Sequence, residues 1–139
     1  SKELLDAAAL AFGMPMGPIE LMDTVGLDVG RSVAHELGHA VPDDSRFAAL
    51  VAQGKLGRKS GEGFYKWEKG KPLKGETPAH ADLAALGREL VKPMVDATVV
   101  AVDEGVVASA DLADIGVILG TGFAPFLGGP MQARQDGKA

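Results

Sequence analysis

Cysteine is absent from this chain of 139 residues. The protein therefore has no disulfide framework, no thiolate nucleophile and no cysteine-based zinc site. A chain without disulfides suits a reducing compartment, so we expect a cytoplasmic location.

The chain also lacks an excess of positive charge. Its formal net charge is −5, and no stretch concentrates lysine and arginine enough to overcome it. Binding to the phosphate backbone of nucleic acids is therefore disfavoured. The expected partners are proteins or small molecules.

No apolar run is long enough to predict a membrane span. The longest uncharged segment extends from Ile115 up to Arg134, and its five glycines and two prolines predict a helix end followed by a loop. The first ten residues, SKELLDAAAL, are charged where a signal peptide needs a hydrophobic region. Their apolar residues already have helical spacing, so we expect the chain to be a piece of a longer protein.

Apolar residues recur at helical spacing along most of the chain, and alternation with a period of two never continues beyond a few residues. With 46% apolar and 24% charged residues, the composition is that of a globular protein. The expected fold class is all-α. Glycine, proline and capping residues (Asp28, one of Asp43, Asp44 and Ser45, then Ser109) delimit helices near residues 2–12, 18–25, 29–40, 47–54, 83–106 and 110–119, with Pro93 kinking or dividing the longest.

Two stretches, residues 4–21 and 112–131, resemble each other. In both, an aspartate early in a helix (Asp6, Asp114) is followed by small and aliphatic residues and then by a Gly-Pro pair. Such an echo suggests a duplicated helix-plus-turn unit. We expect two related helical units, residues 1–69, truncated at its start, and residues 70–139.

The segment AHELGHAV contains His35, Glu36 and His39 in the spacing H-E-x-x-H. On one helix the two imidazoles would lie a turn apart and could share a zinc ion, with Glu36 activating a bound water. A third ligand is not supplied along the helix, because Pro42 ends it, although a distant glutamate could serve. We predict no metal site, and keep a small zinc-dependent hydrolase as an alternative.

The glycine- and lysine-rich segment 54–75 invites a phosphate-binding interpretation through Lys55, Arg58 and Lys59. It fails the P-loop spacing, because Arg58 stands where a glycine should precede the lysine. Aromatic residues in GFYKW predict a structural role instead, with attraction of a coenzyme A phosphate as the alternative. Gly120-Thr121-Gly122 likewise lacks the third glycine of a dinucleotide-binding fingerprint.

The stretches FGMPMGPIELMDTVGLDV and GKLGRKSGEGFYKW resemble the C-terminal domain of the (3S)-hydroxyacyl-CoA dehydrogenases of fatty-acid β-oxidation. DEGVVASADLADIGVILGTGFAPFLGGP resembles the second copy of that domain in the multifunctional enzymes that also contain an enoyl-CoA hydratase. The resemblance implies a helical domain that follows an NAD-binding Rossmann domain in the parent enzyme. That upstream domain would carry NAD and the catalytic His and Glu.

Asparagine is absent from the chain, whereas the family places one on the first helix of this domain, near the substrate thioester. We therefore expect that helix upstream of Ser1, with no catalytic and no cofactor-binding residue here. The resemblance also implies that the turn formed by Met14, Pro15, Met16, Gly17 and Pro18 lines the acyl-CoA cleft. Flexible thioethers suit an acyl pocket, but equally fill core space under a turn. A homodimer is expected, and a ligand-free helical interaction module is the remaining alternative.

Overall fold

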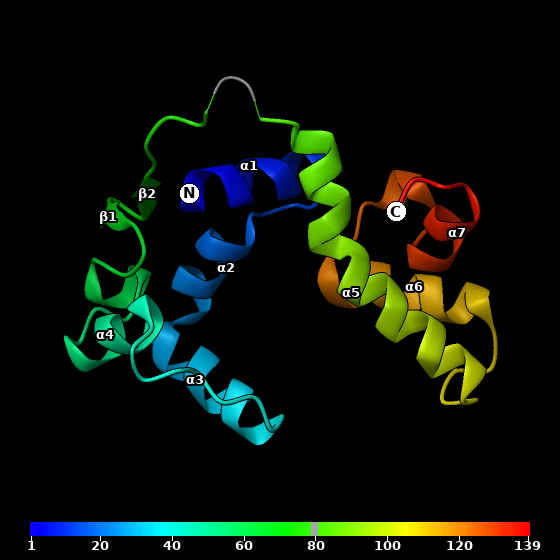
Figure 1. The fold of residues 1–139 in the computed structure, drawn as a ribbon, viewed down its shortest axis with the longest axis horizontal. Coiled ribbons are helices and arrows are strands. Elements are labelled where there is room, and N and C mark those ends of the chain that lie inside the picture. Colours follow the sequence, from blue (N-terminus) through cyan, green and yellow to red (C-terminus); the bar gives the residue numbers. More distant parts are fainter. Residues whose placement is uncertain (79–80) are drawn as a thin grey trace. The chain divides into compact units, whose positions relative to one another are not determined.

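The computed structural model describes residues 1–78 and 81–139 and confirms the all-α fold class (Figure 1). Within these residues the only strands form one short antiparallel hairpin. Contacts divide the chain into two compact units: unit 1 contains Ser1–Glu3 and Pro18–Thr77, and unit 2 contains Leu4–Gly17 and Pro78–Ala139. The elements are α1 (Lys2–Phe12), α2 (Pro18–Val25), α3 (Leu27–Glu36), α4 (Arg46–Ala52), η1 (Arg58–Ser60), β1 (Lys66–Glu68), β2 (Lys71–Leu73), α5 (Leu83–Asp103), α6 (Ala110–Thr121), η2 (Pro125–Leu127) and α7 (Pro130–Gln135).

Three helix starts in unit 1 follow from local chemistry. Pro18 starts α2, because its fixed φ suits a first helical turn. Gly26 alone separates α2 from α3, and its φ of 109° is one that other residues rarely adopt. The Ser45 hydroxyl caps α4 by accepting a hydrogen bond from the Ala48 amide at 3.1 Å.

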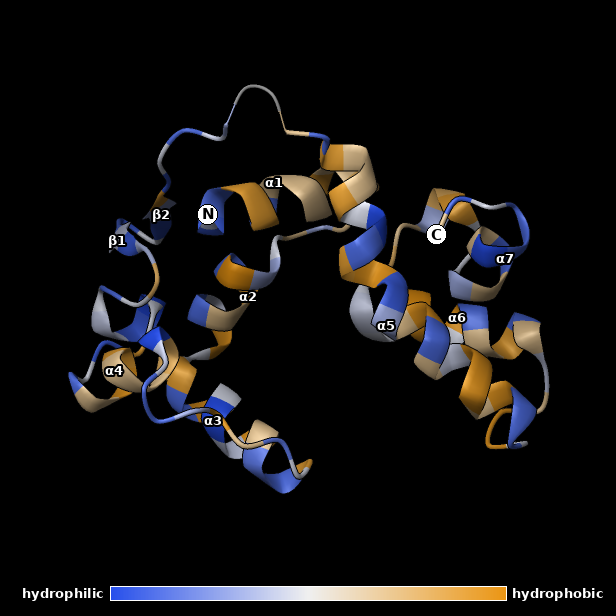
Figure 2. Ribbon diagram, in the orientation of Figure 1, coloured by the Kyte–Doolittle hydropathy of each residue, from blue (hydrophilic) through white to orange (hydrophobic). Residues whose placement is uncertain are grey.

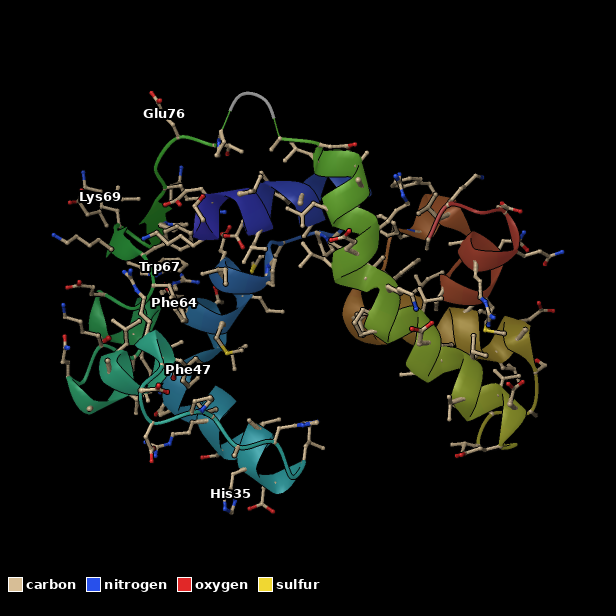
Figure 3. The ribbon with its side chains drawn as sticks, in the orientation of Figure 1. His35, Phe47, Phe64, Trp67, Lys69 and Glu76 are labelled. Carbon is tan, nitrogen blue, oxygen red and sulfur yellow. The ribbon has the colours of Figure 1, made fainter. Side chains whose placement is uncertain are left out.

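The glycine-rich segment after α4 forms one 3₁₀ turn and the β1–β2 hairpin, in which Trp67 lies opposite Pro72. The prediction that it contains neither a long helix nor a long strand is confirmed. Tyr65 anchors it and is fully buried. The ring centroids of Phe47, on α4, and Phe64 lie 6.1 Å apart. The segment therefore also packs against α4 (Figure 3).

Unit 2 encloses the clearest hydrophobic core. The Phe12 and Phe123 rings meet edge to face, with their centroids 5.5 Å apart. Small residues bring the helices close: a Cβ added to Gly87 would lie 2.7 Å from the carbonyl oxygen of Ala8. The other buried members of this core are Val91, Val95, Ala124 and Ala133.

Helix α5 is a single helix of 21 residues, so Pro93 does not divide it. Pro93 lies on the exposed side, where water can satisfy a carbonyl group that loses its helical partner. The buried side consists of Gly87, Val91, Val95 and Thr98. As predicted, the Ser109 hydroxyl caps the next helix, accepting from the Leu112 amide at 3.3 Å.

Two expectations about helices are wrong. Helix α3 covers Leu27–Glu36 rather than residues 29–40, and it starts at an N-cap glycine without a side-chain cap, so Asp28 lies inside its first turn. Helix α7 was missed, because its segment is rich in glycine and proline. Pro130 nevertheless suits the first turn of a helix, and Gly129 precedes it as the N-cap.

The boundary expected between residues 69 and 70 concerns two sequence-related copies, whereas the compact units are defined by contacts. Residues 4–17 pack with the second half of the chain, and residues 70–77 pack with the first. The two-copy division at residue 69 stays a prediction.

Candidate functional site

An apolar groove lies between α2 and α3 in unit 1. Its volume is about 470 Å³, and its surface is almost wholly apolar. Apolar residues occur on both helices (Figure 2). The groove is lined by Pro18, Leu21, Met22, Val25, Gly30, Val33, Ala34, Leu37 and His39.

Helices α2 and α3 approach each other closely at one glycine of the groove lining. A Cβ on Gly30 would lie 2.5 Å from the sulfur of Met22, so the helices approach at that point. Toward the end of α3 the side chains lack an opposing element. Val33 is 51% exposed and Leu37 is 69% exposed.

Three apolar residues of this surface are spaced as core residues but are exposed. Val29, Val33 and Leu37 have the four-residue spacing of a helix face that faces a core. In the structure none of them is buried, and Leu21 and Val25 across the groove are each 50% exposed. A contiguous apolar surface of this kind marks a place where another surface or ligand binds.

The five residues expected to line an acyl pocket have different environments. Met14 packs against the core of unit 2, and Met16 is half-buried. Pro15 is exposed and lies beside Gly122, because a Cβ added to Gly122 would be 2.7 Å from the Cγ of Pro15. Gly17 is buried, whereas Pro18 lines the apolar groove. The contacts of Met14 are those of a core-filling residue, and the substrate role of the set stays a prediction.

The zinc interpretation depends on a helix that the chain does not form. Helix α3 ends at Glu36, and Gly38 has a φ of 75°, so His35 and His39 do not lie on one helix face. The side chains of His35 and Glu36 are 87% and 85% exposed. Figure 3 shows His35 pointing away from α3. Within residues 1–78 and 81–139, no three metal-ligating side chains gather, and His80 lies outside them. A glycine with positive φ ends a helix, so Gly38 prevents the helical spacing that an H-E-x-x-H zinc site requires.

The cations of the glycine-rich segment already have partners. Lys55 donates to Glu62 at 2.9 Å, and Lys59 donates to both oxygens of Asp28 at 2.6 and 2.7 Å. The guanidinium of Arg58 lies 6.0 Å from the centre of the Trp67 ring. These contacts favour the structural role over attraction of a coenzyme A phosphate.

These ion pairs alter the acidity of the carboxylates. The hydrogen bond from Lys59 lowers the pKa of Asp28 below its ordinary value of 3.8. The hydrogen bond from Lys55 likewise lowers the pKa of Glu62. Both effects arise because a nearby cation stabilises the charged form of the acid.

A buried carboxylate organises the same segment. Asp23, on α2, is fully buried and accepts hydrogen bonds from the amides of Phe64 and Tyr65 at 2.9 and 2.8 Å. It also accepts one from the Trp67 indole at 3.0 Å. Gly57 and Gly63 permit this approach, because a Cβ on either would lie within 2.4 Å of an Asp23 atom. Spacing alone gave no signal for this contact, since its partners lie more than 40 residues away.

The internal echo corresponds to a repeated structural contact. Asp114 is buried and accepts hydrogen bonds from the amides of Met131 and Gln132, at the start of α7, at 2.7 and 3.1 Å. A Cβ on Gly129 would lie 2.4 Å from the Asp114 side chain, and a Cβ on Gly17 would lie 2.3 Å from that of Asp6. In both stretches, a glycine before a proline gives room to a buried aspartate.

Comparison with known proteins identifies a protein family. Residues 1–67 match the family described as 3-hydroxyacyl-CoA dehydrogenase, C-terminal domain, and belong to it. The chain as a whole is homologous to a region of the fatty acid oxidation complex subunit alpha.

Three such relatives illustrate the similarity. The protein of Shewanella sp. (strain ANA-3) is 38% identical over 149 residues, and that of Shewanella putrefaciens (strain CN-32 / ATCC BAA-453) is 40% identical over 146. The protein of Vibrio cholerae serotype O1 (strain ATCC 39315 / El Tor Inaba N16961) is 38% identical over 144 residues. Each alignment covers 94% of this chain, which spans only 20–21% of the length of these relatives.

Proposed function

We propose that this chain is the helical substrate-side and association domain of an NAD-dependent 3-hydroxyacyl-CoA dehydrogenase of fatty-acid β-oxidation. The observation that carries the proposal is the exposed apolar groove between α2 and α3, inside the segment that matches the C-terminal domain of this dehydrogenase. The parent is a multifunctional enzyme of lipid metabolism, like the fatty acid oxidation complex subunit alpha to which 94% of the chain aligns.

The chain does not provide the redox chemistry. Gly120 and Thr121 form the end of α6, and Gly122 is its left-handed C-cap with a φ of 71°. A dinucleotide-binding glycine turn instead follows a strand and opens a helix, so that the helix N-terminus meets the pyrophosphate. These residues therefore do not fit NAD, and we assign NAD and the catalytic His and Glu to a Rossmann domain upstream in the parent enzyme.

The contribution of this chain is an apolar surface. Burial of exposed side chains such as Val33 and Leu37 gains about 25 cal/mol for each Å² removed from water. We propose that the upstream Rossmann domain and the second subunit of a homodimer cover such surfaces in the assembled cytoplasmic enzyme. The turn Met14–Pro18 would then form part of the wall that contacts the acyl chain of the substrate.

No helix in the described part of the chain is both long and apolar enough to cross a membrane.

A substitution in the parent enzyme tests the substrate role. Met16→Glu places a charge in the proposed wall and should raise KM for 3-hydroxyacyl-CoA, more for long than for short acyl chains, because longer chains bury more apolar area. NADH formation measures the effect. Leu73→Glu, which replaces an apolar residue 48% exposed on β2, is the control and should leave KM unchanged.

The isolated 139-residue chain should form no NADH. An unchanged KM for Met16→Glu at every acyl length would reject the pocket role and favour a helical interaction module without a ligand. Turnover by the isolated chain would overturn the assignment of the chemistry to an upstream domain.

A further inference from the structure

A charged cleft between α5 and α7 has no role in the proposed function. It lies wholly within unit 2, and its volume is about 430 Å³. Unlike the groove between α2 and α3, it has substantial polar surface. Its charged lining residues are Arg88, Glu89, Lys92, Asp96 and Arg134, and Ala139 lies beside them.

The concentration of cations in this cleft differs from the rest of unit 2. The sequence of unit 2 contains nine aspartates and glutamates in all but only four lysines and arginines, and only Lys138 of these four lies outside the cleft. Three of its four cationic side chains therefore line a single cleft. With three cations and two carboxylates, the lining side chains carry a net charge of +1, whereas unit 2 as a whole has excess negative charge.

The two arginines are available to an external ligand. Within the described part of the chain, neither Arg88 nor Arg134 makes an ion pair or a side-chain hydrogen bond, whereas Lys92 is paired with Asp96. The pairing of Lys92 also offsets the charge of Asp96. Glu89 and, in the 139-residue chain, the terminal carboxylate of Ala139 are the lining carboxylates without such compensation.

The helices that carry the arginines are held together by the core. Arg88 and Lys92 lie one turn apart on α5, so they share a face of that helix. Arg134 lies on α7, beside the buried Ala133, which belongs to the same core cluster as Val91 and Val95 of α5. Both arginines therefore line the cleft from helix backbones that the core holds in place, so that only their side chains have to be ordered on binding.

We propose that this cleft binds a phosphoryl group. A guanidinium offers a planar fork of donors that matches phosphate oxygens, and a phosphate dianion can engage two such forks at once. A doubly charged phosphate also interacts more strongly with two arginines than a singly charged carboxylate does. The cleft exceeds the size of a single phosphate, so it has room for the organic part of a phosphate ester.

Calorimetric titration of the whole chain with inorganic phosphate and, separately, with ADP at low ionic strength tests the site. Arg88→Gln and Arg134→Gln should each weaken binding about three- to fivefold, the effect of losing one solvent-exposed charge contact. Glu89→Gln should tighten binding by a similar factor, since it removes the opposing charge. Arg31→Gln, which removes an exposed arginine from unit 1, is the matched control and should change nothing.

Circular dichroism of each variant verifies that the helices are retained. Equal affinities for phosphate and ADP would assign the site to the phosphoryl group alone, and tighter binding of ADP would show that the ester fills the cleft. An absence of binding, an equal loss in Arg31→Gln, or no gain in Glu89→Gln would overturn the proposal.

Discussion

The indole Nε1 of Trp67 donates a hydrogen bond of 3.0 Å to the carboxylate of Asp23, which precedes it by 44 residues in the chain. Asp23 is fully buried and accepts two further hydrogen bonds from backbone amides of the same segment. One carboxylate thus holds the glycine-rich segment against α2. Its removal should loosen that segment and leave the core of unit 2 intact.

Asp23→Asn should lower the free energy of unfolding by about 2–3 kcal/mol. The asparagine amide is uncharged and has only one acceptor oxygen, so it cannot accept all three hydrogen bonds that Asp23 accepts. Urea unfolding followed by fluorescence measures the loss, since Trp67 is the only tryptophan and reports on this segment. Glu36→Gln, at a side chain 85% exposed, should change stability by less than about 0.5 kcal/mol. Equal stability of the two variants would contradict the anchoring role of Asp23.

Gly129→Ala should destabilise the chain by about 3 kcal/mol. The alanine would have to adopt a positive φ, and its Cβ would overpack the site. Gly129 has a φ of 108°, and its added Cβ would lie 2.4 Å from the Asp114 side chain. Gly116→Ala, in the middle of α6 with no atom within 4 Å of the new Cβ, should instead stabilise by about 0.5–1 kcal/mol. Thermal unfolding compares them, and a shift in the same direction for both would be inconsistent with the packing.

The pair of Asp28 and Lys59 should respond to acid. The hydrogen bond from Lys59 lowers the pKa of Asp28 in the folded chain below 3.8, so the pair stabilises the fold above that pH. The contribution is lost as the pH falls through the folded-state pKa. Carboxyl NMR titration should show the pKa of Asp28 rising in Lys59→Met and unchanged in Lys138→Met. A pKa of Asp28 that does not respond to Lys59→Met would exclude the pair as the cause.

Val33→Glu should separate the isolated chain from the assembled enzyme. Val33 is 51% exposed here, so the stability of the isolated chain should change by less than about 1 kcal/mol. In the parent enzyme the same charge would be buried, which should weaken domain or subunit association and lower kcat/KM. Sedimentation and NADH formation measure these effects. Val106→Glu, at a residue 74% exposed and outside the groove, is the control that should preserve both.

The sequence alone determined the helical class and most helix limits. Pro18, Gly26, Ser45 and Ser109 act through their own backbone conformation or through an amide three residues away, so their effects can be predicted locally. The paired motifs around Asp6 and Asp114 were also visible as spacing. Each follows from interactions within 18 residues along the chain, a range over which pattern and structure are closely linked.

Tertiary structure decided which apolar faces are buried and which charges are free. Val33 and Leu37 have the spacing of core residues, but no element of unit 1 covers them, and that depends on how whole helices pack. The contact between Asp23 and Trp67, and the meeting of Arg88 with Arg134 at one cleft, join residues more than 40 positions apart. Such contacts depend on the path of the chain in space, which periodicity along the sequence does not encode.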